Sequence, residues 1–263
     1  MAIAVFSRPG GQSAPARLRK MHWSTQGLVL CCFMRQGAGY SIYPRVSGHK
    51  YNTGAPVNGA ALGISFTNAS NSNIQLVPSP EDTIIPTQRA TVLIVLHKDD
   101  ATARNSVAWG SQTATSGTLI NGSIPWGDGK VYFRFGASGN TLSVTPTTTA
   151  GTNAWAFVAG RNGMSIWENG VLQASSASAV TRTNGTDAFM LNNGSSTLGD
   201  NQTTHFFALL DAEWTPTQVL EWSANPWIMF DTKPLTMDFS SGSPPVTAKI
   251  PVFMHHYRQQ GIA

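Results

Sequence analysis

Short apolar segments separated by polar turns recur along the chain, roughly every 10–15 residues, which is typical of an antiparallel β-sandwich. The segments expected to form strands are 27–34, 61–66, 74–77, 91–97, 107–109, 130–135, 141–144, 189–191 and 205–210, together with the stretch 153–170. The run 91–97 is apolar and β-branched almost throughout, so we expect both of its faces to be buried. Residues 111–129 are polar and are interpreted as a loop.

The stretch 153–170 predicts two consecutive β-hairpins. Trp155 and Phe157 alternate with smaller residues, as expected of a strand with one buried face. Asn162-Gly163 and Asn169-Gly170 are turn signals, because Asn and Gly accept the positive φ angles that tight hairpin turns require. A chain that reverses twice within so short a stretch builds an antiparallel sheet.

One helix is predicted after the last long strand. Thr215 is a good N-cap residue, Pro216 suits the first helical position, and Gln218 completes a capping box. Asn225-Pro226 then ends the helix. We therefore expect one short helix that packs near the end of the domain.

Several of these motifs carry a resemblance to a known family. The step Trp167-Glu168-Asn169-Gly170-Val171, the opening strand Gly27-Leu28-Val29 and the ending Asn225-Pro226-Trp227 resemble the laminin-G-like, concanavalin A-like domains of tailed-bacteriophage structural proteins. The resemblance covers residues 23–231 and rests on short motifs in the right order. The chain departs from the family at Arg45, where an acidic residue is usual.

The resemblance implies an all-β, concanavalin A-like jelly-roll sandwich of two antiparallel sheets with one short C-terminal helix. This domain is expected to span residues 23–231. Residues 1–22 are rich in Pro, Gly, Ala and Arg and predict an N-terminal arm. Residues 232–263 predict a Pro/Ser linker followed by a tail that bears one strand.

Composition narrows the class of protein further. A chain of 263 residues can bury one large core, and its charged fraction of 11% suits short strands and turns. It contains no run of eighteen apolar residues, and we expect neither a membrane span nor a secretion signal. Cys31 and Cys32 are neighbours on a predicted strand, where they point to opposite faces and are poorly placed to pair. We therefore expect a protein made in a reducing compartment.

Charge is unevenly distributed along the chain. All 13 acidic residues lie after residue 80, whereas seven of the 17 Lys and Arg residues precede it. The predicted assembly arm carries Arg8, Arg17, Arg19 and Lys20. Its partner could be a neighbouring protein, a second copy of the acidic body or a nucleic acid. Nucleic acid is the least favoured of these, because the arm lacks interleaved aromatic residues on which bases could stack.

Trp126, Asp128 and Trp109 are the candidate carbohydrate-binding residues. Trp109 and Trp126 are expected in or near loops, where an aromatic face could stack on a sugar ring. Asp128 and Asp200 could contribute to a calcium site, but neither belongs to a dense acidic cluster, and solvated turn residues are the better interpretation. The tryptophans expected in core or helix-packing positions are Trp155, Trp167, Trp214, Trp222 and Trp227.

Catalytic motifs are not evident. A glycoside hydrolase needs two carboxylates beside the scissile bond, and Asp211 and Glu213 are the nearest approach. They lie just before the helix cap, where acidic residues suit solvent and the helix N-terminus. The sequence has no His-Glu-X-X-His, Cys-X-X-Cys or Gly-X-Ser-X-Gly motif, so we expect no catalytic residues, no structural metal and no cofactor.

These observations favour a non-enzymatic virion structural protein, either a head decoration or a tail-associated protein, that docks through its terminal arms. Its expected partners are other virion proteins, in a homo-oligomer or a capsid or tail lattice. It would be assembled in the host cytoplasm and reside in the virion. The alternative is an adhesin that binds host surface glycan, and the third hypothesis is a glycoside hydrolase.

Overall fold

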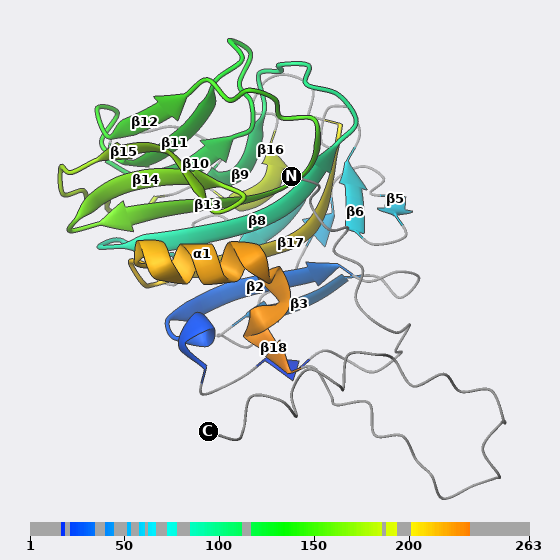
Figure 1. Ribbon diagram of the computed structural model, residues 1–263, viewed down its shortest axis with the longest axis horizontal. Helices are drawn as coiled ribbons and strands as arrows, with labels where there is room; N and C mark the ends of the chain where they lie inside the picture. Colours follow the sequence, from blue (N-terminus) through cyan, green and yellow to red (C-terminus); the bar gives the residue numbers. More distant parts are fainter. Residues whose placement is uncertain are drawn as a thin grey trace, which may run out of the picture. The chain divides into compact units, whose positions relative to one another are not determined.

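The computed structural model describes residues 17–18, 22–34, 40–44, 52–53, 58–60, 63–66, 73–77, 85–111, 117–185, 188–193 and 201–231. These residues form two antiparallel β-sheets packed face to face, with one short helix on the outside of the larger sheet (Figure 1). The predicted all-β jelly-roll sandwich is therefore confirmed. No helix in the described part is long and apolar enough to cross a membrane.

The smaller sheet contains seven described strands. In spatial order they are β12 (Thr141–Val144), β11 (Val131–Gly136), β10 (Leu119–Ser123), β9 (Val107–Ser111), β16 (Phe189–Asn193), β7 (Ile74–Val77) and β4 (Asn52–Thr53).

The larger sheet contains nine described strands. Seven follow the order β15 (Val171–Ser176), β14 (Gly163–Glu168), β13 (Gly151–Gly160), β8 (Ala90–Lys98), β17 (Gln202–Leu210), β2 (Leu28–Met34) and β3 (Tyr40–Pro44). Strand β6 (Gly63–Phe66) also pairs with β17, and β5 (Asn58–Ala60) pairs with β6.

Strand β8 lies at the centre of the larger sheet, paired with β13 on one side and β17 on the other. Its inward side chains, including Val92 and Ile94, enter the core between the sheets. Its outward side chains Leu93 and Val95 join a second apolar layer beneath the helix. The expectation that this run is buried on both faces is confirmed.

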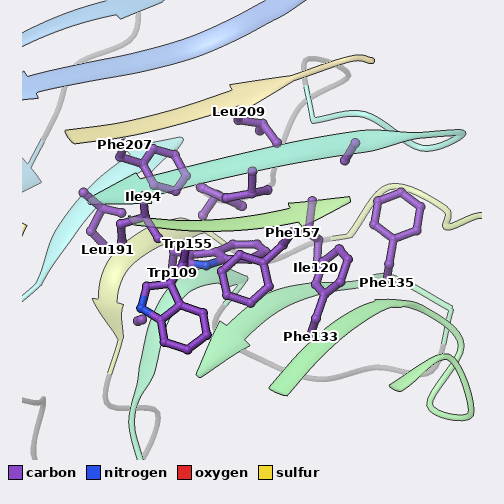
Figure 2. Packing of buried hydrophobic residues seen from close by; sticks show 14 of the residues in the cluster. Ile94, Trp109, Ile120, Phe133, Phe135, Trp155, Phe157, Leu191, Phe207 and Leu209 are labelled. Atoms are coloured by element: carbon purple, nitrogen blue, oxygen red, sulfur yellow. The ribbon is translucent and has the colours of Figure 1, made fainter. Parts of the chain in front are cut away.

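The core between the sheets contains a group of packed aromatic side chains among its aliphatic ones (Figure 2). Trp109 on β9 is fully buried, and its ring centre lies 5.3 Å from that of Phe157 and 5.9 Å from that of Phe133. Gly122 on β10 makes room for it, because a Cβ there would lie 2.6 Å from the Trp109 indole. The expectation that Trp109 lies in or near a loop and meets a sugar is therefore wrong.

The helix α1 (Pro216–Ala224) covers the second apolar layer on the outer face of the larger sheet (Figure 1). Its capping box forms as predicted: the Thr215 hydroxyl accepts from the Gln218 N–H, and the Gln218 side chain accepts from the Thr215 N–H at 2.9 Å. Trp222 packs against Phe206, with ring centres 6.0 Å apart. Two short 3₁₀ turns are also present: η1 (Trp23–Thr25) precedes β2, and η2 (Pro226–Met229) follows α1.

Both predicted hairpins are present in the larger sheet. Strands β13 and β14 are joined at Arg161-Asn162, and β14 and β15 at Asn169-Gly170. Asn169 and Gly170 have φ of 50° and 80°. These left-handed conformations are the reason that the Asn-Gly signal located the turn correctly.

The pattern missed several strands, including β10 and β3. The predicted polar loop 111–129 contains β10, whose residues are buried although the strand includes Asn121 and Gly122. Residues 40–44 were not predicted as a strand, yet they form β3 beside β2. Both segments are short and carry turn-forming residues nearby, and they form strands by pairing with strands that adjoin them in the chain.

Part of the predicted arm forms a small two-stranded sheet that is separate from the two large ones. Strand β1 (Arg17–Leu18) pairs with β18 (Phe230–Asp231), placing Arg17 opposite Asp231 in the ladder. Arg8, Arg19, Lys20, Arg45, Asp200 and the predicted tail 232–263 lie outside the described residues. The proposed docking role of the arm and the outer domain limits remain predictions.

Candidate functional site

The candidate site is built on the loop that joins β10 to β11. This loop is closed by its own backbone: the Trp126 N–H donates to the Lys130 carbonyl at 2.7 Å, and the Gly129 N–H donates to the Trp126 carbonyl at 2.8 Å. Gly129 has φ of 81°, which favours glycine. Trp126 is half-buried, while Asp128 is exposed.

Asp128 fixes the loop to the strand that follows it. One carboxylate oxygen accepts from the Lys130 N–H at 3.0 Å, and the other accepts from the Tyr132 hydroxyl at 2.6 Å. The Tyr132 hydroxyl and the Lys130 N–H lower the pKa of Asp128, and the hydrogen bond to Asp128 raises the pKa of Tyr132. Because each carboxylate oxygen already accepts a hydrogen bond, Asp128 acts in this structure as a brace within the loop.

Arg134 completes the site. On β11, Tyr132 and Arg134 alternate with the buried Val131, Phe133 and Phe135, so both point to the outer face of the smaller sheet. The Arg134 guanidinium carbon lies 5.4 Å from the centre of the Tyr132 ring and 6.0 Å from that of Trp126. These are cation–π distances, and they hold two aromatic rings and one cation together at the surface.

The loop is supported from beneath and from the side. The Lys98 ammonium group, on a side chain that is only 1% exposed, donates to the Ile124 carbonyl at 3.0 Å. A Cβ on Gly127 would lie 2.0 Å from the Asn105 side-chain oxygen, so the two segments approach closely there. The loop is therefore held to β8 and to the segment after β8.

The structure brings together only part of the predicted site. Trp126 and Asp128 do lie in one surface loop, but Trp109 is separated from them in the core. Tyr132 and Arg134 were overlooked, although the alternation Val131-Tyr132-Phe133-Arg134-Phe135 already placed them on the outer face of a strand. What the sequence could not show is that the loop turns Trp126 back toward Arg134.

The alternative catalytic pair has structural partners. Asp211 pairs with Arg89 at 3.3 Å on the surface. Glu213 accepts hydrogen bonds from the backbone N–H groups of Arg161 and Asn162, at 2.9 and 2.8 Å. Within the described residues, no group of three or more His, Cys, Asp or Glu side chains is arranged to hold a metal ion.

No family model matches the chain, and no curated protein matches its sequence. Solved structures do match its fold. Trypanosoma rangeli sialidase aligns with a TM-score of 0.56 and 11% identity, over 77% of this chain and 33% of that chain. The binding domain of botulinum neurotoxin serotype G aligns with a TM-score of 0.54 and 13% identity, over 74% and 50%.

The receptor-binding domain of botulinum neurotoxin D aligns with a TM-score of 0.54 and 10% identity, over 77% of this chain and 53% of that chain. The chain thus spans a third to a half of these solved chains. At such low identity the similarity establishes the lectin-like sandwich fold and nothing about its ligand.

Proposed function

We propose that this protein is a non-enzymatic, glycan-binding β-sandwich whose binding surface consists of Trp126, Tyr132 and Arg134. One observation carries the proposal: two aromatic rings and a guanidinium group lie together on the outer face of the smaller sheet. Aromatic faces stack on the apolar faces of sugar rings, and a guanidinium group donates to sugar oxygens.

The site is largely preformed, which favours binding. The backbone hydrogen bonds of the loop and the Asp128 brace fix its shape before any ligand arrives. A ligand that meets such a surface loses less binding free energy to ordering the protein. The fold offers a precedent, since the matching toxin chains are receptor-binding domains and the T. rangeli sialidase structure was also solved with sialic acid.

A glycan array probed with the full chain tests the proposal, followed by the same array with Trp126→Ala. We expect selective binding by the natural chain and its loss in the variant. Leu172→Ala is the matched control, because Leu172 is exposed but lies on β15 of the larger sheet. Undiminished binding by Trp126→Ala would refute this placement of the site.

A second proposal, compatible with the first, is that the glycan-binding sandwich is displayed on a bacteriophage particle, on its head or tail. The motif behind that resemblance forms as a unit: the Asn225 side chain accepts from the Trp227 N–H at 3.2 Å, and the Trp227 ring lies 6.2 Å from that of Phe206. Docking would fall to the N-terminal arm, residues 1–22, whose basic residues are Arg8, Arg17, Arg19 and Lys20.

Deleting residues 1–16 and replacing Arg19 and Lys20 with Gln tests that docking while leaving the β1–β18 ladder intact. We expect the shortened chain to fold, shown by an unchanged midpoint of thermal unfolding, but to be excluded from particles during assembly. Normal incorporation of the shortened chain would contradict the proposal.

A further inference from the structure

We infer that the glycan recognised by this surface is acidic, with a carboxylate or sulfate group that binds Arg134. This inference rests on the proposed function, and it names the chemical class of ligand. It begins from the unused hydrogen-bonding capacity of Arg134. Among the described residues, the Arg134 side chain has ring contacts but neither a hydrogen bond nor an ion pair.

The position of the guanidinium group favours an anion. Stacking against Tyr132 and Trp126 holds the planar fork in place while its N–H donors remain available. Such a fork matches two oxygens of a carboxylate or sulfate group at once, a geometry that a neutral hydroxyl cannot offer. The pre-oriented side chain also loses little rotamer freedom on binding.

The surroundings of Arg134 contain little competing negative charge. Across the ladder it lies opposite Asn121 on β10 and Thr141 on β12. Tyr132, two residues earlier on the same face, lies opposite Ser123 and Ser143. The outward positions around Arg134 are thus neutral hydrogen-bonding residues.

Asp128 is the acidic residue nearest to this surface in the chain, and its oxygens are already engaged by Lys130 and Tyr132. Asp128 therefore orients Tyr132, and the Arg134 guanidinium group remains available to the ligand. The neutral Thr141 and Ser143, both exposed on β12, could contact the hydroxyl groups of the same sugar. The surface thus offers a complementary group for each feature of an acidic saccharide. The aromatic rings would contact its apolar face, the Thr141 and Ser143 hydroxyls its hydroxyl groups, and Arg134 its negatively charged group.

The experiment compares neutral lactose with two singly charged derivatives, one bearing a carboxylate and the other a sulfate. The full chain is titrated with lactose, 3′-sialyllactose and lactose 3′-sulfate, alongside an array that includes neutral, sialylated, uronic acid and sulfated glycans. We expect acidic glycans to bind at least tenfold more tightly than their neutral counterparts. We also expect this preference to weaken between 50 and 300 mM salt. The sialylated and sulfated arms distinguish a carboxylate ligand from a sulfate ligand.

Arg134→Gln should remove the preference for acidic glycans, and Arg134→Lys should restore only part of it because an ammonium group lacks the planar fork. Arg89→Gln is the control, since Arg89 is an exposed arginine paired with Asp211 away from this site. Binding confined to neutral glycans would overturn the inference and keep the proposed function. Silence across the array would overturn both. Tighter binding of a single-stranded oligonucleotide through the same residues would overturn the assignment to glycan.

Discussion

Glu213 holds Asn162: its carboxylate accepts the Asn162 N–H at 2.8 Å and the neighbouring Arg161 N–H at 2.9 Å. Glu213 follows β17, whereas the two N–H groups belong to the turn between β13 and β14. Gly160 allows this approach, because a Cβ there would lie 2.4 Å from the carboxylate. A residue that the sequence presents as a candidate catalytic acid thus fastens a hairpin turn.

Replacing Glu213 should therefore reduce stability. Glu213→Gln keeps one acceptor but loses its charge, and we expect a loss of about 1 kcal/mol in the free energy of unfolding. Glu213→Ala leaves both N–H groups to water and should lose about 2 kcal/mol. Urea unfolding measures both changes.

The control is Asp211→Asn, which breaks only the exposed pair with Arg89 and should change the free energy of unfolding by less than about 0.5 kcal/mol. The hydrolase hypothesis would be supported instead if the natural chain released reducing sugar and Glu213→Gln abolished this release without loss of stability.

The two tryptophans that the sequence grouped together should behave oppositely. Trp109 is fully buried among core aromatic rings, so Trp109→Ala should cost about 3–5 kcal/mol of stability and Trp109→Phe less. Trp126 lies at the surface, and Trp126→Ala should cost less than about 1 kcal/mol while removing glycan binding. Chemical unfolding and a binding titration on the same samples separate the two effects. Equal losses of stability would contradict the placement of Trp126.

Local features of this fold could be predicted from sequence, and non-local ones could not. The capping box at Thr215 and the turn at Asn169-Gly170 are determined by neighbouring residues, and both formed as predicted. The burial of Trp109 depends on Gly122 across the ladder, and a lone glycine in a polar stretch gave no sign of that contact. Strand β10 was missed because it is short and contains Asn121 and Gly122, which are uncommon in a buried strand.

The candidate site shows the same division. Trp126 and Asp128 were identified because aromatic and acidic residues in a Gly-rich loop are visible in the sequence. Arg134 was missed because its role depends on the loop turning back over β11. Only the three-dimensional arrangement distinguishes this arginine from other surface cations.

The contact between Asp128 and Tyr132 should be visible by titration. Asp128 has a lowered pKa, so its contribution to the free energy of unfolding is present above pH 3.8 and is lost as pH falls through the lowered value. Tyr132 has a raised pKa, so its contribution to the free energy of unfolding is present below pH 10.0 and is lost as pH rises through the raised value. The contact should be intact throughout the neutral range.

Asp128→Asn should lower the pKa of Tyr132 toward about 10, because the negative partner is removed. The measurement is the ultraviolet difference titration of the natural chain and the variant, with Tyr132→Phe identifying the signal. Identical phenol titrations in the natural chain and Asp128→Asn would show that the 2.6 Å hydrogen bond does not persist in solution.

Asn169 combines a backbone role with a side-chain role, and two substitutions can separate them. Its side-chain oxygen accepts from the Ala154 N–H at 2.9 Å, its amide donates to the Asn153 side chain at 2.9 Å, and its φ is 50°. Asn169→Gly keeps the left-handed backbone and loses both hydrogen bonds, for an expected loss of about 1–2 kcal/mol. Asn169→Ala also incurs the left-handed strain and should lose about 1 kcal/mol more. Urea midpoints at constant slope give both values, and equal losses would mean that the backbone conformation contributes nothing.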